Sequence, residues 1–235
     1  MIRPPRVFRI GTKRLVFIDG EPKYIKSELP DPELVESVLG LGVEDDENSD
    51  TDSIDDEDEP ENYDPLSHRG LYDDEIRFIA EKLELPEHGY LGTFPIDKIH
   101  TIAKIVKPGI EKFGFIFNTD PSDKPGKHWI AVAYSADHKE LDYYNSLGEG
   151  PTDQFLDEIK PVIDALRLPY YLKFKINTIP RQGASFNCGY HALLFLYKIL
   201  VEGMSYKFAS GYSEIKKGEK EISTFKDKLE KFGYI

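Results

Sequence analysis

The chain has 235 residues, a formal net charge of -13 and a single cysteine. This length allows one or two domains with a buried core, and one cysteine excludes both an intramolecular disulfide and a multi-cysteine metal site. The sequence has no run of 18 apolar residues and no apolar leader with a cleavage site, so we expect an intracellular protein that is neither secreted nor in contact with a membrane.

The first predicted element is a small N-terminal module, residues 1–43. It has short β-prone runs at residues 7–10, 15–18 and 24–26, separated by turns, and a short helix at residues 31–39. Residues 3–26 carry seven basic and two acidic side chains. This pattern fits a weak nucleic acid contact, a partner-docking element or a basic segment that folds onto the acidic residues that follow.

The acidity of the chain is concentrated in the next segment, residues 44–64, which have 13 acidic and no basic side chains. The other 30 acidic residues balance the 30 lysines and arginines. Because the segment has almost no apolar side chains, burial cannot offset its ordering entropy, and we predict a disordered linker.

The remaining residues, 65–235, are predicted to form one α+β domain. In its first half we expect a helix that Asp73 caps and Pro86 ends, a buried strand at residues 113–118, and a hairpin of residues 129–134 and 140–144. In its second half we expect a helix at 153–166 that Pro161 kinks or splits, a strand at 170–176, an apolar helix at 188–200 and an amphipathic helix at 219–232.

Cys188 follows a turn-rich loop and begins the apolar helix. A lone cysteine is either a buried small hydrophobe or a nucleophile. A nucleophile acts as the thiolate, and the unpaired N–H groups of a helix N-terminus lower the pKa of a thiol. We therefore expect a lowered pKa for Cys188, and we expect Gly189 to let a substrate backbone approach the sulfur.

A thiol nucleophile also needs a base, and the chain has six histidines. They are His68, His88, His100, His128, His138 and His191. His128 begins a predicted strand after a polar loop, which is a rigid place for a general base. His191 lies three residues beyond Cys188 on the same helix and is predicted to be a packing or surface residue.

Two residues compete to orient His128. Asn145 ends the second strand of the hairpin, beside the start of the first, and its amide oxygen can accept a hydrogen bond from the ring. Asp142 lies about 10 Å back along the strand, and its side chain points to the opposite face. Gln182, in the loop before Cys188, is the candidate partner of the Cys188 backbone N–H in binding an oxyanion.

The ordered motifs His128-Trp129, Asn145-Ser146-Leu147-Gly148, Gln182 and Cys188-Gly189 resemble those of the adenain-like clan of cysteine peptidases, which holds the adenovirus-type and the Ulp-type SUMO proteases. Residues 90–95 also resemble a stretch near the start of those domains. The resemblance covers about residues 65–235 and is sharp at 126–148 and 180–196. It implies an α+β fold with a central mixed sheet flanked by helices and the nucleophile at a helix N-terminus.

The resemblance implies that Cys188 is the nucleophile, His128 the general base and Gln182 the oxyanion donor, with no cofactor and no metal. Asn145 stands where these enzymes usually have Asp or Glu. A Cys-His-Asn set supports catalysis in papain-like enzymes, so the change is compatible with an active enzyme and also with a weakened one.

The chain looks most similar to maturation proteases of Maverick/Polinton elements and related double-stranded DNA viruses. This implies a cysteine endopeptidase that cleaves Gly-containing sites in capsid precursors, in the nucleus or cytoplasm of a host cell or in the virion. An isopeptidase that removes ubiquitin or a SUMO-like protein needs the same site. The remaining alternative is a catalytically weakened protein that binds its polypeptide partner.

Overall fold

The structure is a computed structural model that describes residues 6–10, 13–18, 21–26, 69–211 and 215–235. The predicted acidic linker, the predicted helix at residues 31–39 and His68 lie outside these ranges. Near the N-terminus, the three predicted β-prone runs are confirmed as an antiparallel sheet. Its strands are β1 (Arg6–Ile10), β2 (Lys13–Ile18) and β3 (Glu21–Lys26).

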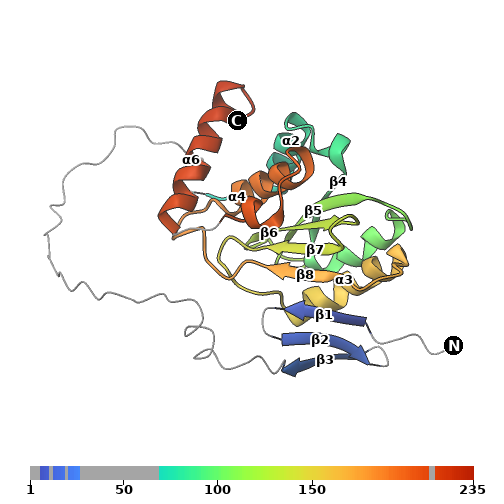
Figure 1. Cartoon of the computed structure of the whole chain (residues 1–235). Coiled ribbons are helices and arrows are strands. Elements are labelled where there is room, and N and C mark those ends of the chain that lie inside the picture. The colour runs from blue at the N-terminus through green and yellow to red at the C-terminus, as the bar shows by residue number, and fades with distance from the viewer. Residues whose placement is uncertain (1–5, 11–12, 19–20, 27–68, 212–214) are drawn as a thin grey trace, which may run out of the picture.

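The centre of the larger domain is a five-stranded sheet in the order β4-β5-β6-β7-β8 (Figure 1). Its strands are β4 (Tyr90–Pro95), β5 (Lys112–Asn118), β6 (Trp129–Ser135), β7 (Glu140–Tyr144) and β8 (Lys173–Ile176). The two outer pairs are parallel and the two inner pairs are antiparallel. The expected mixed sheet is therefore confirmed, as is the hairpin of β6 and β7.

Helices cover both faces of this sheet (Figure 1). The α-helices are α2 (Asp73–Lys82), α3 (Asp153–Leu166), α4 (Cys188–Leu196), α5 (Tyr206–Ala209) and α6 (Ile215–Lys231). Shorter helical segments are the 3-10 segments η1 (Leu85–His88) and η2 (Ile96–Lys104) and the π-helical turn η3 (Tyr197–Val201).

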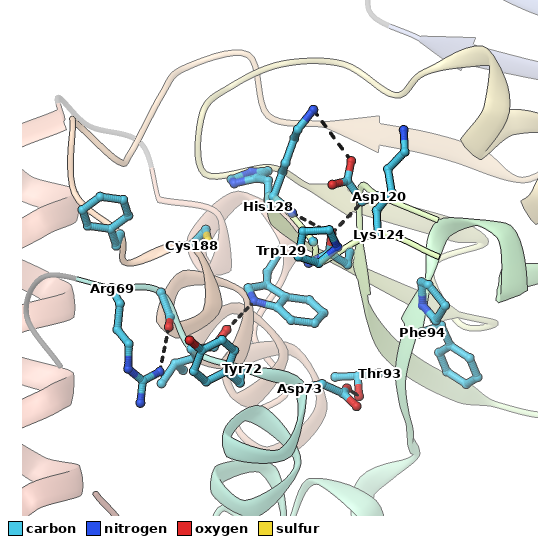
Figure 2. Close-up of a pocket in the computed structure, with 18 of the residues that line it drawn as sticks. Arg69, Tyr72, Asp73, Thr93, Phe94, Asp120, Lys124, His128, Trp129 and Cys188 are labelled. Carbon is cyan, nitrogen blue, oxygen red and sulfur yellow. Dashed lines mark hydrogen bonds and ion pairs between the residues drawn. The ribbon is translucent and has the colours of Figure 1, made fainter. Parts of the chain in front are cut away.

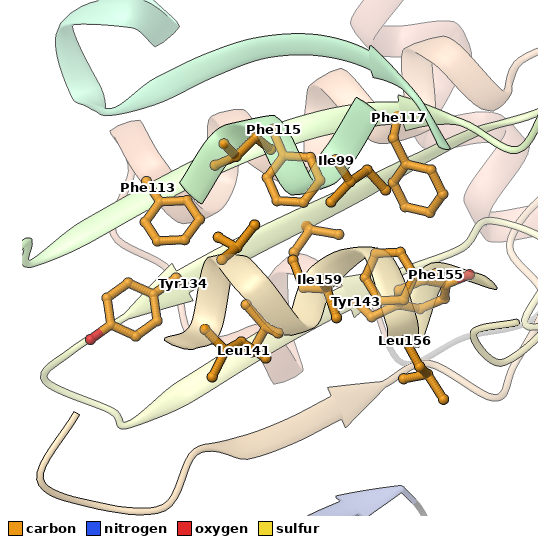
Figure 3. Close-up of a cluster of buried hydrophobic side chains, with 14 of the residues drawn as sticks. Ile99, Phe113, Phe115, Phe117, Tyr134, Leu141, Tyr143, Phe155, Leu156 and Ile159 are labelled. Atoms are coloured by element: carbon orange, nitrogen blue, oxygen red, sulfur yellow. The ribbon is translucent and has the colours of Figure 1, made fainter. Parts of the chain in front are cut away.

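The two faces of the sheet bury separate apolar clusters, because side chains alternate along each strand. On one face, aromatic residues of β5 and β7 pack against α3 and η2 (Figure 3). The Phe117 and Phe155 rings stack there with centroids 5.0 Å apart. On the other face, apolar residues of α2, α4 and α6 pack together.

Small residues on the second face let α4 lie close to the sheet. Ala131 and Ala133 of β6 are fully buried there. A Cβ at Gly114 of β5 would lie 2.9 Å from Leu196 Cδ2 and 3.0 Å from Leu200 Cδ1, so a larger residue there would require the ends of these two leucine side chains to shift. This close packing holds the N-terminus of α4, and with it Cys188, against the sheet.

Three local predictions are wrong in detail, and one is decided in part. Of the kink or split predicted at Pro161, the split is wrong, because α3 is continuous. Asp73 is the first helical residue and not the cap; the Tyr72 backbone N–H donates to Glu75 Oε2 instead, at 2.7 Å. The strand predicted at 170–176 begins only at Lys173. The helix predicted at 188–200 changes from α to π geometry at Tyr197.

Candidate active site

Cys188 is the first residue of α4 and is 7% exposed. Burial raises the pKa of its thiol, and the backbone N–H groups of Trp129, Gly189 and Cys188 only partly oppose this effect. The expectation of a lowered pKa is therefore wrong for the resting thiol, because the cost of desolvating a thiolate outweighs the helix N-terminus. Cys188 is predominantly a neutral thiol at neutral pH.

The neighbour of Gly189 is Leu71, from the segment that leads into α2. A Cβ at position 189 would lie 3.1 Å from both Leu71 Cβ and Leu71 Cδ1. The glycine therefore serves the packing of that segment on α4. The expected approach of a substrate backbone at Gly189 stays a prediction.

His128 lies immediately before β6, and its Nε2 is 2.8 Å from Asn145 Oδ1. The same oxygen accepts the Leu147 backbone N–H at 2.9 Å. Since this oxygen is an acceptor, His128 Nε2 carries the hydrogen, and Nδ1 is left with a free lone pair. Burial lowers the pKa of His128, and the hydrogen bond with Asn145 opposes this only in part. The ring is therefore a neutral base at neutral pH.

Asn145 is itself held by Asn177, which follows β8. The Asn145 backbone N–H donates to Asn177 Oδ1 at 2.9 Å, and Asn177 Nδ2 donates to the Asn145 carbonyl at 2.6 Å. Sequence reasoning missed Asn177, because its role depends on the parallel pairing of β7 with β8, which no local pattern indicates.

Asp142 lies away from His128. It pairs with Ala133 of β6 and Lys175 of β8, and only 4% of it is exposed. Burial raises its pKa to about 7, and its Oδ1 has no hydrogen-bond partner among the described residues. The structure thus places Asn145, and not Asp142, at the imidazole.

Gln182 is buried beside the turn that contains Ser146. Ser146 Oγ donates to Gln182 Oε1 at 2.7 Å, and the Ser146 carbonyl accepts the backbone N–H of Gln182 at 3.0 Å. Gln182 Nε2 donates to the Ser185 carbonyl at 2.5 Å. An amide nitrogen has two hydrogens, so one remains for a further acceptor. Ser146 belongs to a motif that the sequence singled out, but its contact with Gln182 was not predicted.

Cys188, His128 and Gln182 line one cleft of about 1180 Å³ (Figure 2). Trp129 also lines it, and its Nε1 donates to the Leu71 carbonyl at 2.8 Å. The segment around Tyr72 borders the cleft on one side, and Asp120 and Lys124 border it on the other. An extended polypeptide can thus reach the sulfur between two walls.

His191 is 3% exposed, and its Nδ1 lies 3.3 Å from the Tyr144 hydroxyl. Burial lowers its pKa to about 4. This neutral ring confirms the prediction of a packing residue. In the described part of the chain, no three side chains of His, Cys, Asp or Glu form a group that could hold a metal ion. Within the same residues, no helix has the length and apolar character of a membrane span.

The chain is similar to known cysteine proteases in sequence and in fold. A family model described as the Ulp1 protease family, C-terminal catalytic domain, matches residues 114–232. The cysteine protease S273R of African swine fever virus, isolate Tick/Malawi/Lil 20-1/1983, is 29% identical over 110 residues, which cover 44% of this chain and 39% of the relative. The SUMO-1 cysteine protease S273R of isolate Tick/South Africa/Pretoriuskop Pr4/1996 is 28% identical with the same coverage.

A solved structure shares the fold. The crystal structure of the ASFV pS273R protease has a TM-score of 0.51 and 18% identity, and the match covers 64% of each chain. The matched region spans only 39% of the length of the curated viral relatives.

Proposed function

The chain belongs to the Ulp1 protease family of cysteine-type peptidases, and we propose that it is an endopeptidase that cleaves Gly-containing sites in viral or element-encoded capsid precursors. One observation carries the proposal. Cys188, His128 and Gln182 line one cleft, and Asn145 orients the histidine.

The proposed reaction is acyl transfer through a thioester. Cys188 Sγ attacks the scissile carbonyl carbon while His128 Nδ1 takes the thiol proton. The Cys188 backbone N–H and the free Gln182 amide hydrogen stabilise the oxyanion. The C–N bond then breaks, and His128 gives the proton to the leaving amine. Water attacks the thioester and His128 takes its proton. The C–S bond then breaks, the acid leaves, and His128 returns the proton to the Cys188 sulfur.

The test is cleavage of a capsid precursor from the virus or element that encodes this chain, with the products read by mass spectrometry. We expect cuts at Gly-containing sites with the full chain and none with Cys188→Ala. A Cys188→Ala variant that still makes the same cuts would contradict the proposal. A catalytically weakened binding protein would bind the precursor and leave it intact.

The second candidate is a deconjugating isopeptidase for a ubiquitin-like protein. The name of one viral relative, SUMO-1 cysteine protease, favours it. Ubiquitin and SUMO vinyl probes at equimolar dose distinguish the two functions. Stoichiometric labelling of Cys188 supports the isopeptidase. Labelling no faster than that by iodoacetamide, in a chain that cleaves the precursor, supports the endopeptidase.

Precursor cleavage also fits a site of action inside the host cell or in the virion, as the sequence predicts. Imaging of the tagged chain in infected cells tests this. The weak nucleic acid contact of the basic N-terminal module stays a prediction.

A further inference from the structure

The C-terminal helix α6 contacts the loop that leads to Cys188. Glu219 Oε1 accepts the Gly183 backbone N–H at 2.8 Å and Ser185 Oγ at 2.6 Å. Glu219 Oε2 accepts Asn187 Nδ2 at 2.9 Å. One carboxylate thus holds three of the five residues between Gln182 and Cys188.

This loop also sets the orientation of the Gln182 amide. Gln182 Nε2 donates to the Ser185 carbonyl, and Ser185 donates through its hydroxyl to Glu219. Ser146 fixes the amide oxygen from the other side. The contacts with Ser146 and Ser185 therefore set the direction of the second hydrogen on Gln182 Nε2. The contact with Ser185 depends in turn on Glu219.

The start of α6 is seated closely on the same loop. A Cβ at Gly218 would collide with the Arg181 carbonyl, and Arg181 pairs with Glu221 at 2.9 Å. Burial works against ionisation of Glu219, but the hydrogen bonds from Ser185, Asn187 and Gly183 outweigh it and keep its pKa below the ordinary value. Glu219 is therefore a charged acceptor at neutral pH.

We propose that Glu219 is a positioning residue for the oxyanion site: it holds the loop of residues 183–187 so that the Gln182 amide and the Cys188 backbone N–H point at the same oxygen. This inference rests on the proposed acyl transfer, because an oxyanion forms only in that reaction. Glu219 is not among the residues that line the cleft, so it acts through Gln182 and the loop.

The test compares Glu219→Gln with the native chain, using a peptide aldehyde that ends in Gly-Gly. An aldehyde forms a tetrahedral adduct with Cys188 whose oxygen needs the oxyanion donors, whereas alkylation by iodoacetamide needs none. We expect about tenfold weaker aldehyde binding, since a charge-assisted hydrogen bond is lost, and an unchanged alkylation rate. On the capsid precursor, kcat should fall by a similar factor with KM nearly constant.

Glu230→Gln is the matched control. Glu230 is exposed on the same helix, and its substitution removes the same charge without touching the loop. It should leave aldehyde binding and alkylation as in the native chain. An equal loss in Glu230→Gln would assign the effect to the charge of α6 and overturn the proposal.

Rescue tests the hydrogen bond itself. In Glu219→Gln the new amide nitrogen faces Asn187 Nδ2, so two donors meet; adding Asn187→Asp supplies an acceptor. We expect the double variant to bind the aldehyde more tightly than either single variant. In a Gln182→Ala background, Glu219→Gln should weaken aldehyde binding little further, because the donor that Glu219 positions is already absent.

The outcomes separate this proposal from the proposed function. If the native chain neither cleaves the precursor nor binds the aldehyde, the proposed function fails. If it does both and Glu219→Gln matches it, only the role of Glu219 fails. If Glu219→Gln does not fold, Ser185→Ala and Asn187→Ala each remove one contact from the loop side, and native aldehyde binding in both would overturn the proposal.

Discussion

The pair of Cys188 and His128 rests as a neutral thiol and a neutral imidazole, because burial raises the pKa of the first and lowers the pKa of the second. We expect the rate at which iodoacetamide alkylates Cys188 to rise with pH. The midpoint of this rise should lie at a higher pH than the midpoint for free cysteine measured in the same experiment. A midpoint below the free value would indicate a resting thiolate–imidazolium pair instead.

Asn145 orients His128 without a charge, and this determines where activity is lost at low pH. His128 stays neutral below its ordinary pKa of about 6.5, so the acid limb of kcat/KM should lie below that pH. Asn145→Asp adds a carboxylate that favours the imidazolium, and the limb should move up by about one unit. If the acid limb of kcat/KM does not move in Asn145→Asp, the assignment of Asn145 as the residue that orients His128 is contradicted.

The roles of His128 and Asn145 differ in how much activity is lost when each residue is replaced. His128→Ala removes the base and should lower kcat by about 10²–10⁴. Asn145→Ala removes only an orienting contact, so we expect a smaller loss and no upward shift of the acid limb. A loss in Asn145→Ala that equals the loss in His128→Ala would contradict the orienting role.

At the scale of elements, Asn118 shapes the loop of residues 119–127 beside the cleft. Its Oδ1 accepts the backbone N–H groups of Asp120 and Lys127, both at 3.0 Å. Asn118→Ala leaves both groups without this acceptor and should lower the free energy of unfolding by about 1–3 kcal/mol and raise KM. Asn118→Asp keeps an acceptor, so it should stay closer to the native chain in denaturant and kinetic measurements.

Helix α3 keeps Pro161 inside an unbroken helix, which costs the backbone N–H bond to the carbonyl of Asp157. Pro161→Ala should therefore raise the free energy of unfolding by about 1–3 kcal/mol in urea titrations. Activity should not change, because α3 packs on the sheet face opposite α4. Lys160→Ala, one residue earlier, should change stability by no more than about 0.5 kcal/mol.

Sequence patterns predicted the elements better than the contacts between them. The apolar spacing of residues 153–166 located α3, and the alternation around the Ala136–Lys139 turn located the hairpin that brings Asn145 to His128. Local patterns do not show burial, so the pKa direction of Cys188 was wrong. They also do not show which distant segments meet, so Asn177, 32 residues from Asn145, was missed.

At the scale of the whole molecule, every described residue of the site lies between Arg69 and Glu219. The two apolar clusters of the sheet also come from this region and the rest of α6. We expect residues 65–235 alone to unfold cooperatively and to cleave the precursor with the kcat/KM of the full chain. A loss of more than tenfold on removal of residues 1–64 would show that the N-terminal module takes part in catalysis.

The buried, neutral state of Cys188 also affects how long the enzyme lasts before it meets a substrate. Peroxide attacks thiolates that are open to solvent, and oxidation beyond the sulfenic acid destroys a nucleophile that the chain cannot replace. In the proposed reaction His128 takes the proton only during attack on a carbonyl, so we expect the sulfur to be a poor target for oxidants between turnovers. The same burial that delays ionisation thus preserves the single cysteine of the chain for the reaction.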